Sequence, residues 1–420
     1  MSNNDNKIDD KNRNVPVLRF EGFTDPWVQC KLGEVLDERN DQAPMNNEYP
    51  LMAFIANEGV SPKGSRYDRS ALVKDQKNKL YKKTEFGDFI YSSNNLESGS
   101  IGLNKYGKAS LSPVYNIFKL RDNSDSGFLG NRLIREDLIN SMIKYRQGVI
   151  YGQWRVPVYE FLNIKVLIPI LEEQRKVGAI IEILESLITL EQEKLEHLTD
   201  ISNYLSSKLF PKKSKLSPIL RKIQKSEAWE KYKLGESGRS FGGLTGKTKD
   251  DFGHGEAKYI TYKNIFDNIF VNSNQLDATP IDHKQNKILF GDTIFTLSSE
   301  TPEEVGMSSV CLLEIEELYL NSFCFGYRFN PDKKVNYLYL AYYFRSAEFR
   351  DRMRILAQGI SRYNISQQQV MKLDILLPDI EEQEFVGQVL NKHYKYIKLQ
   401  NEKIKKLQTL RQFLMQTLFI

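Results

Sequence analysis

The chain has 420 residues, of which 40% are hydrophobic, and a formal net charge of +5. A single hydrophobic core stops growing near about 250 to 300 residues, so this length predicts at least two domains. The mild basic charge fits a nucleic-acid partner but does not by itself establish one.

Residues 1–16 are polar and charged without an apolar segment, so we expect a disordered tail rather than a signal peptide or an anchor. No run approaches the roughly 18 apolar residues that cross a bilayer. Cys30, Cys311 and Cys324 lack C-x-x-C spacing and are expected to be free thiols. The four histidines form no H-x-x-x-H pair, so no metal site is visible. We expect a cytoplasmic protein without membrane contact.

Residues 17–165 have the pattern of a mixed α/β domain. Short runs such as FGDFIYS are aromatic and β-branched and end at Gly, Asn or Asp, which is typical of strands and turns. Residues 127–146 have helical spacing instead. This segment is the first predicted domain.

Residues 166–210 are predicted to form a long helix. Pro169 followed by Glu172 and Glu173 marks its start, because acidic residues in a first turn complement the positive end of the helix dipole. Residues 211–228 are basic and interrupted by proline, which predicts a linker.

Residues 229–374 repeat the mixed pattern, with a helical segment at 335–355, and residues 375–420 form a second long helix. The second domain opens on SGRSFGGLTGKTKDDFG, whose Gly246, Lys247 and Thr248 resemble the end of a P-loop. A P-loop also needs glycine five positions before Gly246, and that position is Phe241. We therefore interpret the stretch as a flexible basic loop.

The chain is an internal duplication. Residues 164–181 and 373–390 share P-x-x-E-E-Q and a following glycine at one constant offset. Upstream, residues 31–34 and 233–236 share K-L-G-E, and FGD occurs at a comparable place in both halves. Repeats fix architecture, so two copies of one plan are expected.

The two long helices carry matching heptad seams, which predicts that they pack on each other as an antiparallel coiled coil. The alternative is that each seam covers only its own domain. Glu191 and Gln400 are corresponding polar seam positions. The apolar seam residues are Ile181, Leu184, Ile188, Leu195, Leu198, Leu205 and Leu209 in the first helix and Leu390, Ile397, Ile404, Leu407, Leu414 and Leu418 in the second.

These features resemble the specificity (S) subunit of Type I restriction-modification systems. The resemblance is carried by residues 169–184 and 378–390, the two K-L-G-E motifs and QGISRYNIS at 358–366, and it covers nearly all of the chain after about residue 16. It implies an α/β (mixed α+β) fold with two target recognition domains, separated by two long antiparallel helices that form a coiled-coil spacer.

The resemblance also implies the partners. Each recognition domain would read one half of an asymmetric, bipartite sequence in double-stranded DNA. The helices would set the spacer length and dock two methyltransferase (M) subunits, and restriction (R) subunits would join for cleavage. No cofactor is expected on this chain, because S-adenosylmethionine, Mg and ATP would be bound by the partner subunits.

Candidate DNA contacts come from exposed-type loops rich in Arg, Lys, Ser and Tyr, the residue types that contact phosphates and base edges. For any single residue, an ordinary solvated surface position is the alternative. The candidates are Lys63, Arg66, Tyr67, Arg69, Arg146, Gln153 and Arg155 in the first domain and Arg239, Lys247, Lys249, Ser361, Arg362 and Tyr363 in the second.

No methyltransferase motif of the N-P-P-[YF] type is present, and no catalytic residue is assigned. Two other classes of protein are considered. A P-loop ATPase with coiled-coil arms would bind nucleotide, and a coiled-coil scaffold would lack DNA affinity.

Overall fold

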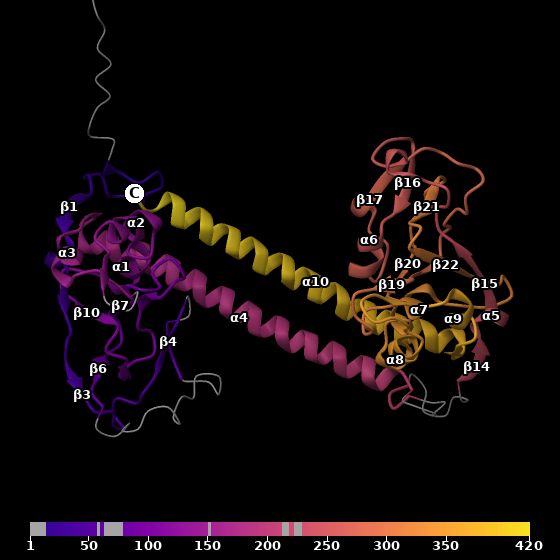
Figure 1. Cartoon of the computed structure of the whole chain (residues 1–420), viewed down its shortest axis with the longest axis horizontal. Coiled ribbons are helices and arrows are strands. Elements are labelled where there is room, and N and C mark those ends of the chain that lie inside the picture. The colour runs from indigo at the N-terminus through magenta and orange to yellow at the C-terminus, as the bar shows by residue number, and fades with distance from the viewer. Residues whose placement is uncertain (1–13, 57–58, 63–78, 150–152, 212–217, 222–228) are drawn as a thin grey trace, which may run out of the picture. The chain divides into compact units, whose positions relative to one another are not determined.

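The computed structural model describes residues 14–56, 59–62, 79–149, 153–211, 218–221 and 229–420 (Figure 1). The chain divides into two compact units, residues 1–192 with 403–420 (unit 1) and residues 193–402 (unit 2). Among the described residues, no helix has the length and apolar character needed to cross a membrane. The architecture is mixed α+β, as the sequence predicts.

The described residues of unit 1 form two small antiparallel sheets, with strand orders β2-β10-β7-β8 and β3-β6-β9, and three two-stranded pairs. Its main core gathers Trp27, Phe89, Phe118, Phe128 and Phe161. The elements are β1 (Val28–Lys31), η2 (Leu32–Glu34), β2 (Leu36–Glu38), β3 (Gln42–Ala43), β4 (Ala53–Ile55), β5 (Gly59–Ser61), β6 (Tyr81–Thr84), β7 (Phe89–Tyr91), β8 (Ile101–Leu103), β9 (Ala109–Leu111), β10 (Asn116–Leu120), α1 (Ser126–Arg132), α2 (Glu136–Lys144), β11 (Gln147–Val149), β12 (Gln153–Arg155), α3 (Val158–Asn163) and β13 (Lys165–Ile168).

Unit 2 follows the same plan, with sheets ordered β15-β22-β18-β20 and β17-β16-β21. Strands β16 and β21 pair in parallel. The elements are β14 (Glu230–Lys233), α5 (Leu234–Ser237), β15 (Gly238–Gly242), η5 (Lys249–Asp251), β16 (Ala257–Ile260), α6 (Tyr262–Asp267), η6 (Ser273–Gln275), β17 (Leu276–Thr279), β18 (Thr293–Thr296), β19 (Ser298–Ser299), β20 (Ser308–Val310), β21 (Leu318–Leu320), β22 (Cys324–Phe329), α7 (Tyr337–Tyr343), α8 (Ala347–Ile355), β23 (Tyr363–Asn364), α9 (Gln367–Val370) and β24 (Asp374–Leu377).

The two helical segments predicted in the mixed domains are each divided into two shorter helices. The sequence predicts one helix at 127–146 and one at 335–355, but the structure has α1 with α2 and α7 with α8. In the second half, the Ser346 side chain accepts a hydrogen bond from the Phe349 amide and caps a new helix. Helical periodicity alone does not reveal such an internal cap.

The long helices are α4 (Leu171–Leu209) and α10 (Ile380–Thr417). Within unit 1 they pack antiparallel, because Glu185 pairs with Arg411 at 2.7 Å while Glu191, further along α4, pairs with Lys403 at 2.6 Å. Burial disfavours the ionised Glu185, yet the hydrogen bonds from Lys105 and Arg411 outweigh it and lower the pKa of that carboxyl. Within unit 2, Leu209 shares a core with Val386 and Leu390 from the start of α10.

The P-x-x-E-E-Q motif fixes the start of each long helix to its domain, and we call the contacts of its glutamine and its second glutamate the lock. The Gln174 side chain donates to the Pro169 carbonyl at 2.9 Å, and its oxygen accepts from the Asp125 amide, next to α1. Gln383 does the same for the Pro378 carbonyl and the Asn336 amide at α7. Figure 1 shows α1 beside the first turns of α4 and α7 beside those of α10.

The second glutamate of the motif forms a buried ion pair. Glu173 accepts two hydrogen bonds of 2.8 Å from Arg19, and Glu382 pairs with Arg221 at 2.7 Å. Both carboxylates are almost fully buried. Arg221 belongs to the segment expected to be a linker, so this part of the segment has a structural role.

The motif glycines allow close helix contact. A Cβ on Gly178 would lie 2.7 Å from the Phe128 amide nitrogen, and one on Gly387 would lie 2.8 Å from that of Tyr339. Both distances are shorter than real Cβ contacts, so any larger residue would push the long helix away from α1 or α7.

The K-L-G-E motif joins each domain's first strand to the strand before the long helix. Strand β1 pairs with β13 and β14 pairs with β24, both antiparallel. Leu32 and Leu234 are fully buried, and each donates its amide to a carbonyl of the segment leading into that last strand. The duplicated motifs therefore close each domain onto its own long helix.

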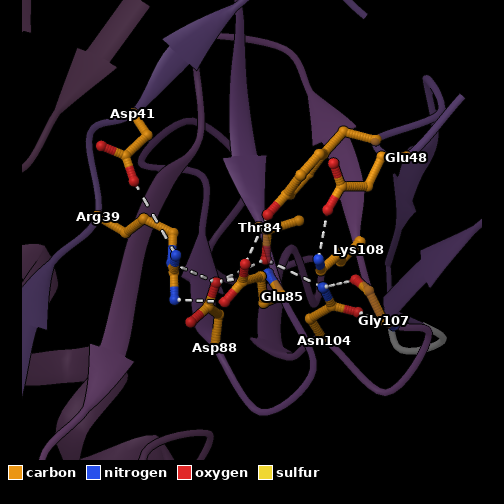
Figure 2. Close-up of polar contacts among 10 residues, drawn as sticks. Arg39, Asp41, Glu48, Thr84, Glu85, Asp88, Asn104, Gly107 and Lys108 are labelled. Atoms are coloured by element: carbon orange, nitrogen blue, oxygen red, sulfur yellow. Dashed lines mark hydrogen bonds and ion pairs between the residues drawn. The ribbon is translucent and has the colours of Figure 1, made fainter. Parts of the chain in front are cut away.

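The FGD motif forms a tight turn capped by its aspartate. Asp88 accepts from the Glu85 amide at 2.7 Å and forms an ion pair with Arg39 at 2.9 Å (Figure 2). Burial raises the pKa of the Asp88 carboxyl. In unit 2, Asp292 accepts from the Leu289 amide and pairs with Arg328 at 2.6 Å. The equivalent buried aspartates of the two units are thus paired with arginines from different places in the sequence.

Candidate nucleic-acid interface

In unit 1, the structure describes only part of the predicted contact surface. Lys63, Arg66, Tyr67 and Arg69 lie outside the described residues, and of Gln153 only the backbone, in β12, is described. Arg155, at the end of β12, is exposed. The described parts of two stretches, residues 92–100 and residues 145–149 with 153–155, are brought together.

A hairpin of β11 and β12 carries Gln153 and Arg155, and Arg146 directly precedes it. Its Trp154 amide donates to the Asn94 side chain at 2.6 Å, and the Val156 amide donates to Ser93 at 3.0 Å. Arg146 forms two hydrogen bonds to Glu97 and lies 5.8 Å from the Trp154 ring centre. Trp154 is 48% exposed, so its ring is not part of the core. Arg146 is held by an acid that neutralises it.

A second hairpin occupies the corresponding place in unit 2. Gln358 and Asn364 exchange backbone hydrogen bonds of 2.9 and 2.8 Å, and β23 pairs with β19, directly after β18. Ser361 and Arg362 are exposed between them, and Tyr363 is half-buried. Both units therefore place a short hairpin beside the end of an equivalent strand.

The glycine-rich stretch is a strand followed by a loop. Strand β15 ends at Gly242, and the helix after Thr248 is η5, a single short turn. A P-loop requires a longer helix whose N-terminus faces the phosphates. Lys247 is 14% exposed and pairs with Asp282 at 2.8 Å, while Arg239 and Lys249 are exposed.

The Lys247–Asp282 pair is the best-defined electrostatic feature of this loop. Hydrogen bonds from Lys247 and Gln285 lower the pKa of the Asp282 carboxyl to about 2. The same contact raises the pKa of the Lys247 ammonium. The loop is thus pinned to the domain by Lys247, whereas Lys249 is left at the surface.

The turn at residues 321–324 brings the two second-domain segments together. Leu244 donates its amide to the Leu320 carbonyl, and the Arg362 guanidinium lies 5.9 Å from the Phe323 ring centre. Between glycine loop and turn is a cavity of about 400 Å³, lined by residues 242–247 with Phe252, Leu297, Ser322 and Cys324. Two stretches far apart in the sequence therefore form one surface.

Sequence reasoning missed Phe323 and Ile360 on this surface. Phe323 is 57% exposed and Ile360 is 96% exposed. An apolar residue in a loop normally predicts core packing. The only signal in the sequence was the position of Ile360, between Gly359 and Arg362 in a stretch already chosen for DNA contact.

The predicted seam residues of α4 and α10 are all buried or half-buried. Ile181, Leu209 and Leu390 are among the most buried. The polar seam positions Glu191 and Gln400 are buried as well.

A second apolar stripe lies one residue before the seam, and it is exposed. Its members correspond between the helices at the same offset as the seam, and their exposed fractions run from 42% to 61%. The corresponding pairs are Leu187 with Tyr396, Leu190 with Leu399, Ile201 with Leu410, and Tyr204 with Phe413. Each unit therefore carries an equivalent set of four exposed apolar residues.

No group of three or more His, Cys, Asp or Glu side chains suited to hold a metal ion occurs in the described part of the chain. The geometry is that of a duplicated protein whose two units each present an exposed hairpin with an arginine.

Comparison with known protein families finds one family that matches both repeats. The family model of the Type I restriction modification DNA specificity domain matches residues 24–200 and again residues 226–409. The chain therefore belongs to this family, and the resemblance drawn from the repeated motifs is confirmed.

Solved structures show the same fold. The S subunit of the Type I restriction-modification system from M. genitalium is similar with a TM-score of 0.58 at 12% identity, covering 97% of this chain and 99% of that one. A structure concerning complex assembly and conformational transition of the type I R-M system is similar with a TM-score of 0.51 at 16% identity, covering 93% and 96%.

Proposed function

We propose that this chain is the non-catalytic, cytoplasmic subunit that selects the DNA sequence for a Type I restriction-modification complex. The observation that carries the proposal is the duplicated hairpin. Each unit presents one beside an equivalent strand, with an exposed arginine and an exposed aromatic ring on the hairpin or on the turn next to it. Two non-identical surfaces in one chain would read an asymmetric, bipartite target, whereas a homodimer would impose a palindrome.

The long helices would set the unread spacer between the two half-sites. Helix α4 has 39 residues, and at 1.5 Å per residue such a helix is on the order of 55 to 60 Å long. Inserting four residues into both helices should change the spacer length and leave both half-site sequences as they are. Altered half-sites would contradict this role.

The exposed stripe supports docking of two M subunits. Exposed apolar patches on long helices commonly mark protein interfaces. Because the two sets of four residues correspond position by position, one kind of partner would fit both. R subunits would add to this assembly for cleavage. S-adenosylmethionine, Mg and ATP would be bound by the partner subunits.

Mapping methylated bases in DNA from cells that express this chain with its M subunit tests the proposal. We expect one bipartite, asymmetric motif that disappears when this chain is omitted. A motif that persists without the chain, or no sequence preference, would contradict it. A scaffold without DNA affinity predicts the second outcome, and a P-loop ATPase predicts nucleotide binding by the isolated chain.

A further inference from the structure

Unit 2 exposes two apolar side chains close to Arg362, one two residues before it in the hairpin and one against its guanidinium. Ile360 is 96% exposed in the hairpin, and Phe323 is 57% exposed on the neighbouring turn. The Arg362 guanidinium lies 5.9 Å from the Phe323 ring centre, within the range of a cation–π contact. Among the residues that the structure describes, no carboxylate forms an ion pair with Arg362.

The backbone holds both apolar residues in defined positions. Gly359 has φ of +135°, and a Cβ there would lie 2.1 Å from the Arg362 carbonyl oxygen, so only glycine allows this hairpin. On the turn, the Phe323 amide donates to the Asn321 side chain at 2.9 Å. The Phe323 carbonyl accepts from the Leu297 amide, also at 2.9 Å.

The chemistry of this surface matches the edge of a base pair. Arginine bonds guanine O6 and N7 in the major groove, and apolar side chains contact the 5-methyl group of thymine. The 321–324 turn also borders the glycine-rich loop across a cavity, and the Arg362 guanidinium lies over the Phe323 ring. A polyanion suits such a surface better than an apolar protein face does.

We propose that Ile360 packs against the 5-methyl group of a thymine and that Phe323 positions Arg362 against a guanine of the same half-site. This inference rests on the proposed DNA recognition function. Ile360 and Phe323 then supply sequence specificity through one methyl contact and one oriented guanidinium.

The test uses the chain in complex with its M subunit and the DNA target found by methylation mapping. Each thymine of the target is replaced in turn by deoxyuridine, which lacks only the methyl group. For the native chain, one replacement should weaken binding about fourfold, the value of one buried methyl group. Ile360→Ala should lose that sensitivity. Ile355→Ala, a 79% exposed isoleucine on α8, is the matched control and should keep it.

The guanine contact is tested in the same way with 7-deazaguanine, which lacks N7. One replacement should weaken binding by the native chain at least fivefold and leave Arg362→Ala unaffected. Phe323→Ala should reduce the discrimination, and Phe323→Tyr should keep it. Arg354→Ala, an exposed arginine paired with Asp351, is the control.

Two results would overturn the inference: no position sensitive to deoxyuridine, or sensitivity unchanged in Ile360→Ala. Failure of the proposed function looks different, because the native complex would then show no preference for any DNA sequence.

Discussion

Glu173 and Glu382 stand at the same position of the two repeats and make the same contact, a buried ion pair with an arginine far away in the sequence. Arg146 and Arg362 also stand on corresponding hairpins, yet their surroundings differ. Glu97 pairs with Arg146, whereas Arg362 lies against an exposed phenylalanine. The repeats keep the contacts that hold the long helices and vary those that face outward. Variation of this kind is expected where each half reads its own sequence.

The largest expected effect is a loss of stability when the glutamate ion pair of the lock is removed in either unit. Glu173→Ala and Glu382→Ala each remove the buried carboxylate that pairs with a partly buried arginine, so each should lower the free energy of unfolding by up to about 3 kcal/mol. Urea unfolding of the purified variants measures this. Glu172→Ala, an exposed neighbour, should change the free energy by less than about 0.5 kcal/mol. Equal effects of Glu172→Ala and Glu173→Ala would show that the Glu173 ion pair does not stabilise the fold as we describe.

The lock shows how far the sequence could predict the fold. The constant offset revealed the repeats, the long helices and the glutamate itself, because these are local patterns. It did not reveal Arg19 or Arg221, because each contacts its glutamate across more than 150 residues of chain. Such pairing depends on the tertiary fold, and no local pattern records it.

The candidate interface was predictable only in part, for a related reason. Loop composition pointed to Arg362 and Lys247, which the structure brings to one turn. Composition did not distinguish Arg146, which is neutralised by Glu97, from Arg362. It also assigned apolar side chains to the core, and so missed the exposed Ile360.

The next largest effect concerns the exposed apolar stripes, which we expect to be equivalent docking surfaces in the two units. Leu187→Asp in unit 1 should prevent one M subunit from docking, and Tyr396→Asp in unit 2 the other, because a charge in an apolar interface is costly. The measured mass of the complex should correspond to one M subunit instead of two in each single variant, and to no M subunit in the double variant. Gln192→Asp, exposed on the same helix, is the control. Loss of both copies in a single variant would show that the patches are not independent.

A smaller effect separates the two hairpins. Arg362→Ala should weaken DNA binding by about 1 to 3 kcal/mol and unequally among sequences, because it removes a base contact. Glu97→Gln should release Arg146 and strengthen binding to all sequences alike, with a steeper salt dependence by about one phosphate contact. Binding titrations at several salt concentrations measure both. If Glu97→Gln changes the preferred sequence instead, Arg146 is a base reader that Glu97 orients, and the contrast between the hairpins disappears.

The smallest effect is a titration in the loop of the second domain. Lys247 lowers the pKa of Asp282 to about 2, below the ordinary value of 3.8, so the folded state favours the ionised carboxylate. The stabilisation is therefore present above about pH 4 and is lost as the pH falls through about 2. NMR titration of the Asp282 carboxyl should show this low pKa in the native chain and a higher pKa in Lys247→Ala, still below the ordinary value because the hydrogen bonds from Gln285 and the Lys284 amide remain. Lys249→Ala, two residues away and exposed, should leave the titration unchanged, because Lys249 does not contribute to the lowered pKa of Asp282. An equal shift in both lysine variants would mean that the general basic charge of the loop lowers the pKa, and Lys247 would then be as free to contact DNA as Lys249.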